Sequence, residues 1–182
     1  MRYTAIADVS KTLVELIRDN VVPDLIAKED SIGLCTPDNT GDFLLGIYLY
    51  NVEQSESFRI SGRQNEGLHH QKYPPIVLDL HYMITPYYKS DIKFLALDEQ
   101  VLLGRIIQIL NDNGVIFADS GEPVELELEN ISLDDRQKIW TADSAYRTSV
   151  FLSARAVIVE SARQSEISRV SEVHIYADQK KR

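Results

Sequence analysis

The sequence predicts an α+β fold: a single domain in which helices pack on a mostly antiparallel, mixed sheet. Three observations lead to this prediction. Apolar residues recur at helical spacing near residues 6–17 and 91–111, and with strand patterning in several other segments. The two kinds of segment do not alternate regularly, as they would in a parallel βαβ fold. The chain has 182 residues, of which 44% are hydrophobic, which fits one domain with a packed core.

The N-terminal third is expected to form one helix and two strands. Apolar residues at helical spacing predict the helix, and Pro23 ends or kinks it. A short strand is predicted at residues 32–36, before a turn. Residues 43–52 are apolar on both faces, which is typical of an interior strand. The apolar face of the helix consists of Ile6, Val9, Leu13, Leu16 and Ile17.

The segment from Tyr73 to Pro86 has the clearest strand pattern in the chain. Pro74 and Pro75 open it and Pro86 closes it, and proline belongs at strand starts and edges because it donates no hydrogen bond. One face is fully apolar and the other is mixed, so we expect the mixed face to be lightly covered or to lie against another chain. The apolar face is Ile76, Leu78, Leu80, Tyr82 and Ile84, and the mixed face is Val77, Asp79, His81, Met83 and Thr85.

A long helix is predicted from about residue 91 to 111. Its apolar face is so broad that we expect the helix to be largely buried against the sheet. The run 111–114 stops it, and Gly114 is expected to provide a left-handed cap. The apolar residues are Phe94, Leu97, Val101, Leu102, Leu103, Ile106, Ile107, Ile109 and Leu110.

The C-terminal third is predicted to contain two more strands and a short helix. Residues 124–131 alternate, as a strand with one solvated face does. Ser132 begins a capping box for a short helix that runs through Trp140. A long strand is expected at residues 146–160. Its two faces are predicted to be Val150, Leu152, Ala154, Ala156 and Ile158 on one side, and Phe151, Arg155, Val157 and Val159 on the other.

We therefore expect a body over residues 1–160, a projecting arm at 53–73 and a polar C-terminal tail at 161–182. The arm is predicted because a long polar excursion between two good strands is unusual in a compact domain. The tail contains one short strand-like alternation at residues 173–176.

Charge and composition exclude several classes of function. Asp and Glu number 28 against 19 Lys and Arg, so the net charge of −9 disfavours nucleic acid as a partner. No signal peptide and no membrane-spanning stretch is visible, so we expect a cytoplasmic protein with no membrane partner. Cys35 is the only cysteine, which rules out an intrachain disulfide. No histidine lies near it in the sequence, so we interpret it as a small packing residue.

No catalytic or cofactor motif is present. The sequence lacks a phosphate-binding glycine loop, HExxH, CxxC and GxSxG, and we expect no cofactor. The one candidate pair is Asp79 and His81, whose side chains are expected to point the same way from one strand. A metal or general-base role is one interpretation. The other is a hydrogen-bonded pair at the sheet surface or at a subunit contact.

Two charged groups are candidates for an interface. Alternating glutamates form either a solvated strand face or a contact for a basic neighbour. The arm carries positive charge, and a basic arm with an acidic stripe on one chain would suit head-to-tail self-association. The stripe is Glu125, Glu127 and Glu129, and the arm residues are Arg59, Arg63, His69, His70 and Lys72.

Read together, these segments resemble the cap, or tail-terminator-like, proteins of contractile injection systems, which are related to the terminators of contractile phage tails. The resemblance covers nearly all of residues 3–160 and is strongest in the Pro-Pro-aliphatic-Leu-Asp-Leu-x-Tyr run at Pro74–Tyr82. The other matching segments are Ile6–Val9, Ile47–Glu53, Leu102–Gly104, Ile107–Leu110, Lys138–Trp140 and Ala156–Val159.

The resemblance implies a structural role in assembly, without catalysis, metal or cofactor. It implies a hexameric ring that closes the distal end of the inner tube, touches the last sheath layer, stops tube growth and couples tube to sheath. The subunit would be loaded in the cytoplasm of the producing cell and become part of a phage tail-like particle. Val173 and Ile175 would then lie in a tail segment that adds a strand to a sheath subunit. Two alternatives stay open: a phage or prophage tail terminator or completion protein, and a small enzyme that uses Asp79 and His81.

Overall fold

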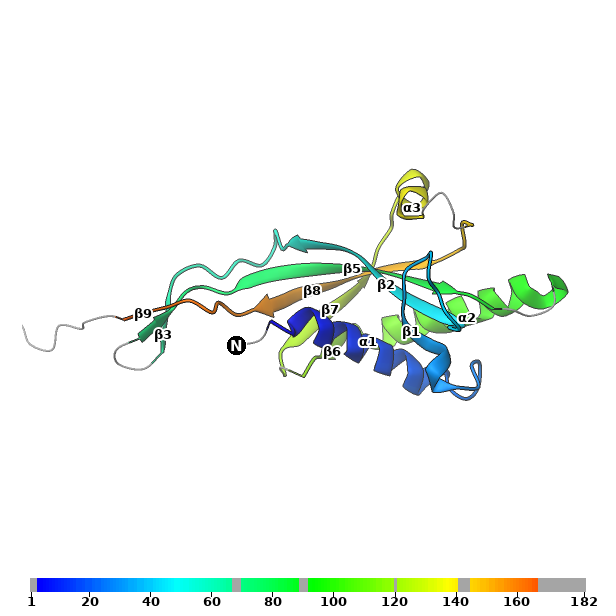
Figure 1. Cartoon of the computed structure of the whole chain (residues 1–182), viewed down its shortest axis with the longest axis horizontal. Coiled ribbons are helices and arrows are strands. Elements are labelled where there is room, and N and C mark those ends of the chain that lie inside the picture. The colour runs from blue at the N-terminus through cyan, green and yellow to red at the C-terminus, as the bar shows by residue number, and fades with distance from the viewer. Residues whose placement is uncertain (1–2, 67–69, 89–91, 120, 141–144, 167–182) are drawn as a thin grey trace, which may run out of the picture.

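The structure, a computed structural model, describes residues 3–66, 70–88, 92–119, 121–140 and 145–166. A six-stranded sheet forms the body, and a separate three-stranded sheet lies at one end of the molecule (Figure 1). Helices α1 and α2 lie on one side of the larger sheet and α3 lies on the other. This arrangement confirms the predicted α+β class.

The elements follow one another without regular alternation. They are α1 (Ala5–Val21), η1 (Glu29–Ser31), β1 (Ile32–Leu34), β2 (Leu45–Gln54), β3 (Gln64–Glu66), β4 (His70–Lys72), β5 (Ile76–Pro86), α2 (Ile92–Asp112), β6 (Val115–Phe117), β7 (Pro123–Leu128), α3 (Leu133–Ile139), β8 (Val150–Val159) and β9 (Gln164–Glu166).

The larger sheet has the order β1-β2-β5-β8-β7-β6. β5, the strand predicted from its flanking prolines, lies inside the sheet and pairs antiparallel with β2 and β8. β1 pairs parallel with β2, and the other pairs of this sheet are antiparallel, so the sheet is mixed as predicted.

The main core lies between this sheet and helices α1 and α2. Leu80, Tyr82 and Ile84 of β5 are fully buried there, which confirms the predicted apolar face for these residues. The Tyr82 hydroxyl is 2.8 Å from Ser10 Oγ of α1, so the polar end of this buried ring has a hydrogen-bond partner. The helix residues in the core include Val9, Leu13 and Ile17 of α1 and Leu102, Ile106, Ile109 and Leu110 of α2.

The opposite side of the sheet carries a smaller cluster of Met83, Tyr87, Trp140 and Phe151. Trp140 follows directly after α3, whose N-terminus is capped by Ser132: its hydroxyl accepts a hydrogen bond from the backbone N–H of Asp135. On the mixed face of β5, Val77, Met83 and Thr85 are buried, and Asp79 and His81 are partly buried. This face is therefore better covered by the chain itself than the sequence predicted.

A β-bulge in β8, where this strand pairs with β5, changes which side of the sheet its side chains face. The register of the two strands shifts between Leu78 and Leu80, at the point where Ala156 adopts a positive φ of 63°. The inserted residue reverses the facing of the strand beyond it. Val157 therefore joins the main core. The predicted faces of β8, with Ala156 and Ile158 continuing the face of Leu152, are wrong past the bulge.

The prediction that α2 is largely buried is wrong for its first half. Phe94, Leu97 and Val101 are 59%, 60% and 50% exposed. In Figure 1 the first turns of this helix extend past the end of the sheet, which leaves no surface for these residues to pack against. Gly114 also departs from expectation, since the described glycines with positive φ are Gly41, Gly62 and Gly121.

Candidate functional site

The most distinctive surface is the arm, which we define as residues 58–66, 70–73 and 161–166. Its strands β3, β4 and β9 form the three-stranded sheet at the far end of the molecule from α2 (Figure 1). β4 is central and pairs antiparallel with both neighbours, so that His70 lies opposite both Glu66 and Glu166. Part of the segment predicted as a polar tail thus pairs with the arm.

An aromatic ring with two guanidinium groups holds the arm together. The guanidinium carbons of Arg63 and Arg163 lie 4.6 and 4.4 Å from the centre of the Tyr73 ring. Arg63 also donates to the Tyr73 hydroxyl at 3.2 Å and to Ser165 Oγ at 3.5 Å. The backbone N–H of Tyr73 donates to the carbonyl of Arg163 at 3.0 Å. These contacts join three segments of the arm and fix two positive charges on its surface.

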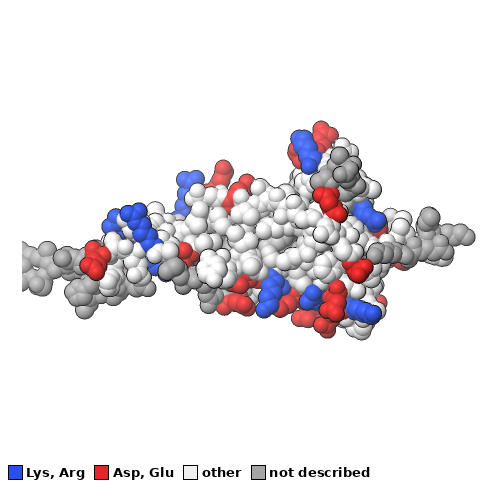
Figure 2. Space-filling view, viewed as in Figure 1, with Lys and Arg blue, Asp and Glu red and all other residues white. Residues whose placement is uncertain are grey.

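Positive charge gathers over the arm, at the left of Figure 2, although the whole chain is acidic. Arg59 and His70 are exposed. Lys72 forms an ion pair with Glu160 at 2.9 Å. The remaining predicted arm residue, His69, lies outside the described residues. Tyr73 and Arg163 were missed by sequence reasoning, because Arg163 was placed in the tail and only the strand pairing brings it to Tyr73.

The three glutamates predicted as one acidic stripe have different surroundings. Glu125 is exposed on β7. Glu127 forms an ion pair with Arg155 of β8 at 2.6 Å. Glu129 lies just after β7 with its side chain only 18% exposed, and it accepts hydrogen bonds from Tyr50 at 2.9 Å and His81 at 2.7 Å. Glu125 and Glu127 thus form the solvent-facing part of this group.

His81 bridges two carboxylates. Its Nδ1 is 2.7 Å from Glu129 Oε1 and its Nε2 is 3.0 Å from Glu53 Oε1, so the ring connects the end of β2 with the segment after β7. The Tyr50 ring lies 6.0 Å away, centre to centre. Burial and the hydrogen bond to Glu129 raise the pKa of Tyr50, so its hydroxyl stays a donor. The cluster ties strands together, and both ring nitrogens of His81 already lie within hydrogen-bond distance of a carboxylate.

Asp79 does not share these partners. Its Oδ1 accepts a hydrogen bond from the backbone N–H of Ala156 at 3.3 Å, at the bulge in β8. Asp79 and His81 therefore hold different parts of the sheet, and the described structure gives no support to the catalytic interpretation of this pair. Within the described part of the chain, no group of three or more His, Cys, Asp or Glu side chains is placed to hold a metal ion.

The remaining residues singled out from the sequence add no further functional site. Cys35 is partly buried, its sulfur lies where a Cβ on Gly46 would be, and burial raises the pKa of the thiol. Val173 and Ile175 lie outside the described residues. Among the helices in the described ranges, none has the length and apolarity needed to cross a membrane.

Comparison with known proteins gives a consistent result. Residues 8–172 match the Pvc16 N-terminal domain family. The fold is similar to a PVC sheath/tube terminator of an extracellular contractile injection system, solved in the extended state, at 18% identity and a TM-score of 0.71. That match covers 96% of this chain and 64% of the terminator.

A second similar structure is the cap of the anti-feeding prophage, a tube-terminating cap. Identity is 15% and the TM-score is 0.68, over 94% of this chain and 61% of the cap. The chain thus spans less than two thirds of the length of either structure. No curated protein sequence matches it significantly.

The resemblance to cap proteins of contractile injection systems is confirmed by these matches. The family match extends over most of the chain, from α1 to beyond β9. The chain belongs to the Pvc16 N-terminal domain family.

Proposed function

We propose that this chain is a structural cap subunit of a contractile injection system, which closes one end of the inner tube, stops its growth and links it to the sheath. The observation that carries the proposal is the combination of the family match over residues 8–172 with a terminator fold over 96% of the chain. Both similar structures are terminators by name, and one of them belongs to an extracellular contractile injection system. An injection system is therefore the preferred setting over a phage tail.

The arm is the proposed docking element. It is extended, it is held rigid by the Arg63–Tyr73–Arg163 contacts, and its charge is opposite to the net charge of −9. A preorganised pair of guanidinium groups suits carboxylates on a partner, because guanidinium binds carboxylate with two parallel hydrogen bonds. We place the tube end or an adjacent subunit against this surface, with Arg59 at its exposed base.

A ring is the proposed assembly, and six copies are the expected number. Ring contacts are heterologous, so each subunit needs two different surfaces. The exposed carboxylates of Glu125 and Glu127 are candidate hydrogen-bond acceptors for basic side chains of a neighbouring subunit. The segment with Val173 and Ile175 is a candidate strand for a sheath subunit. The protein would be made in the cytoplasm of the producing cell and then become part of the particle.

We propose a non-enzymatic role, and the partners of Asp79 and His81 support it. Asp79 supports the bulge in β8 and His81 joins two carboxylates, so both residues of the enzyme alternative already have structural partners. We therefore expect His81→Ala to lower stability while the subunit, once folded, still caps tubes.

The proposal is tested by locating the chain on purified tubes. A gold-labelled, tagged chain should decorate one end of each tube in negative-stain electron microscopy. Arg59→Glu reverses an exposed charge of the arm and leaves the Arg63–Tyr73–Arg163 contacts in place, so it should weaken decoration without unfolding the protein. Lys11→Glu is the matched control, because Lys11 is 64% exposed on α1, far from the arm. Labels spread along the tube wall, or absent from it, would contradict the proposal.

The tail is tested separately by deleting residues 170–182, which keeps β9 in the arm. If the tail adds a strand to the sheath, sheath should detach from capped tubes while the tube ends stay decorated. Unchanged sheath attachment would contradict the proposal that the segment with Val173 and Ile175 adds a strand to a sheath subunit.

A further inference from the structure

The outer edge of the larger sheet at β6 is open. β6 is the last strand in the sheet order, and its partner in the described part of the chain is β7. The backbone N–H of Leu126 donates to the carbonyl of Gly114 at 2.8 Å, which sets the alternation of hydrogen bonds along this antiparallel pair. The backbone N–H and C=O groups of Val115 and Phe117 therefore point away from β7, where the described residues place no further strand. β6 can thus accept another strand.

The opposite edge of the same sheet is protected. On β1 the carbonyl of Ile32 accepts a hydrogen bond from Arg18 Nη2 of α1 at 2.6 Å, so a side chain occupies this acceptor at the edge. β6, with the sequence Val-Ile-Phe, has neither a charge nor a proline, and Val115 and Phe117 are 48% and 65% exposed. Proteins usually block the sheet edges that must not pair. An open edge with exposed apolar side chains therefore indicates a partner strand.

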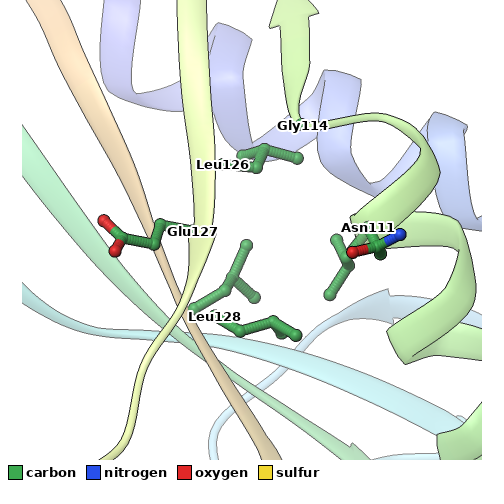
Figure 3. A pocket seen from close by; sticks show the side chains of 7 residues that line it. Asn111, Gly114, Leu126, Glu127 and Leu128 are labelled. Carbon is green, nitrogen blue, oxygen red and sulfur yellow. The ribbon is translucent and has the colours of Figure 1, made fainter.

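Acidic side chains lie beside the open edge. Val115 lies directly opposite Glu125 of β7, so the two side chains are on the same side of the sheet. Glu127 follows on that side: in Figure 3 it points away from Leu126 and Asn111, which line a pocket on the side of α2. Glu125 is exposed, and no cationic side chain among the described residues pairs with it. A strand that covers this edge is therefore expected to bring positive charge.

The arm supplies a strand of this kind. In the arm sheet, the backbone N–H of Tyr73 donates to the carbonyl of Arg163, which sets the alternation along the central strand β4. The N–H and C=O groups of Asn65 in β3 therefore point outward, away from β4. Arg63, two residues earlier, lies on the same side of this sheet as Asn65, and no carboxylate among the described residues pairs with it. β3 thus combines an open edge with a guanidinium group that no acidic side chain of the described chain neutralises.

We propose that β3 of one copy pairs antiparallel with β6 of a second copy, so that the arm of each subunit extends the larger sheet of the next. The outward-facing residues of the two strands form the hydrogen-bonded pairs, which brings Arg63 to the side of the sheet that carries Phe117, Val115 and Glu125. Within one chain, β3 and β6 lie apart along the molecule (Figure 1), so a second copy supplies the strand. The contact is heterologous and closes into a ring when the rotation between copies allows it. This inference rests on the proposed function, since it names the contact that would join neighbouring cap subunits.

The first test removes one outward-facing backbone donor. Val115→Pro deletes an N–H that the pairing with β7 does not use, so the chain keeps its own hydrogen bonds, as circular dichroism would verify. Self-association of the purified full chain, measured by sedimentation equilibrium, should weaken by at least about tenfold. Val115→Thr is the matched control, because it keeps the N–H and the β-branched shape, and it should associate as the wild-type chain does. Unchanged association of a folded Val115→Pro chain, or a wild-type chain that is monomeric at its highest soluble concentration, would overturn the inference.

Charge gives an independent test of the same contact. Glu125→Arg places a cation on the side of the sheet that receives Arg63 of the second copy, so it should weaken association about threefold to tenfold. Glu29→Arg is the control, because Glu29 is exposed on η1, next to β1 at the opposite edge of the sheet, and the substitution changes the net charge equally. Equal effects of the two substitutions would mean that total charge governs association, and would overturn the inference.

Cross-linking tests the pairing without depending on loss of binding. A chain with both Asn65→Cys and Phe117→Cys should give a ladder of covalent multimers with a short thiol-specific cross-linker, whereas each single variant should give none beyond the unsubstituted control. Dimers from Phe117→Cys alone would mean that two β6 edges pair with each other, and would overturn the inference. If the ladder forms but the chain does not bind tube ends, the contact stands and the proposed function fails. If tube ends are capped but no ladder forms, the reverse holds.

Discussion

The bulge at Ala156 gives the most specific test of the fold. An alanine at a φ of 63° lies in the left-handed region, which costs an L-residue with a Cβ roughly 1–2 kcal/mol. Glycine removes that cost but gains freedom in the unfolded chain, which takes back about 0.4–1 kcal/mol. Ala156→Gly should therefore raise the free energy of unfolding by roughly 0.5–1 kcal/mol. Ala156→Val should lower it by about 1–3 kcal/mol, because a β-branched residue fits this region worst.

Urea denaturation measures both changes, followed by far-UV circular dichroism and by the fluorescence of Trp140, the only tryptophan, which is buried beside the second face of the sheet. Ala154→Gly is the matched control. Ala154 is fully buried two residues earlier on the same strand, where the chain is in register, so glycine there should destabilise. If Ala156→Gly lowered the stability and Ala156→Val left it unchanged, the claim that Ala156 adopts a left-handed conformation in a bulge would be refuted.

Three further outcomes are expected. Leu80→Ala should destabilise by about 2–5 kcal/mol, because Leu80 is fully buried at the centre of the main core; thermal melting measures this, and a loss below about 1 kcal/mol would contradict it. Ser132→Ala should cost about 1 kcal/mol through loss of the α3 cap, while Ser132→Thr, which keeps a hydroxyl that can both accept from the backbone and donate to Asp135, should keep most of the stability, as urea denaturation would show. Stability should fall as the pH rises from 10 to 12, because burial raises the pKa of Tyr82 to about 12 from 10.0, so the folded chain holds this proton more tightly than the unfolded one. Below pH 10 that contribution is complete, and Tyr82→Phe should flatten the alkaline slope.

Local patterns predicted the elements of the body well. Prolines bounded β5 correctly, and helical spacing located the start of α1 and both ends of α2 to within about one residue, since burial of one face imposes a period on the sequence. Strand β8 begins at Val150 and not at Tyr146, because apolar residues alone do not show where pairing starts.

The bulge in β8 and the arm strands could not be predicted in the same way. β8 is apolar on both faces, so the residue inserted at Ala156 does not interrupt any alternation of apolar and polar residues. Strands β3, β4 and β9 have three residues each, too few for a period to appear. The contact from Arg63 to Ser165 spans 102 residues, and the bond from Tyr50 to Glu129 spans 79. One sequence carries no signal for pairs at such separations.

The exposed half of α2 shows a different limit. Its apolar residues satisfy the same pattern whether they pack against the same chain or against another. The sequence therefore predicted burial for Phe94, Leu97 and Val101, but the pattern alone did not justify naming the sheet as the surface that covers them. Only the position of the helix, past the end of the sheet, separates the two sets of apolar residues (Figure 1).

Tube elongation in the presence of the chain tests the central claim most directly. Preformed tubes are extended with fresh tube protein, with and without a stoichiometric amount of the purified chain at the tube ends, and lengths are measured by electron microscopy. The account predicts that growth stops at the end that carries the chain. Continued growth through decorated ends would contradict it.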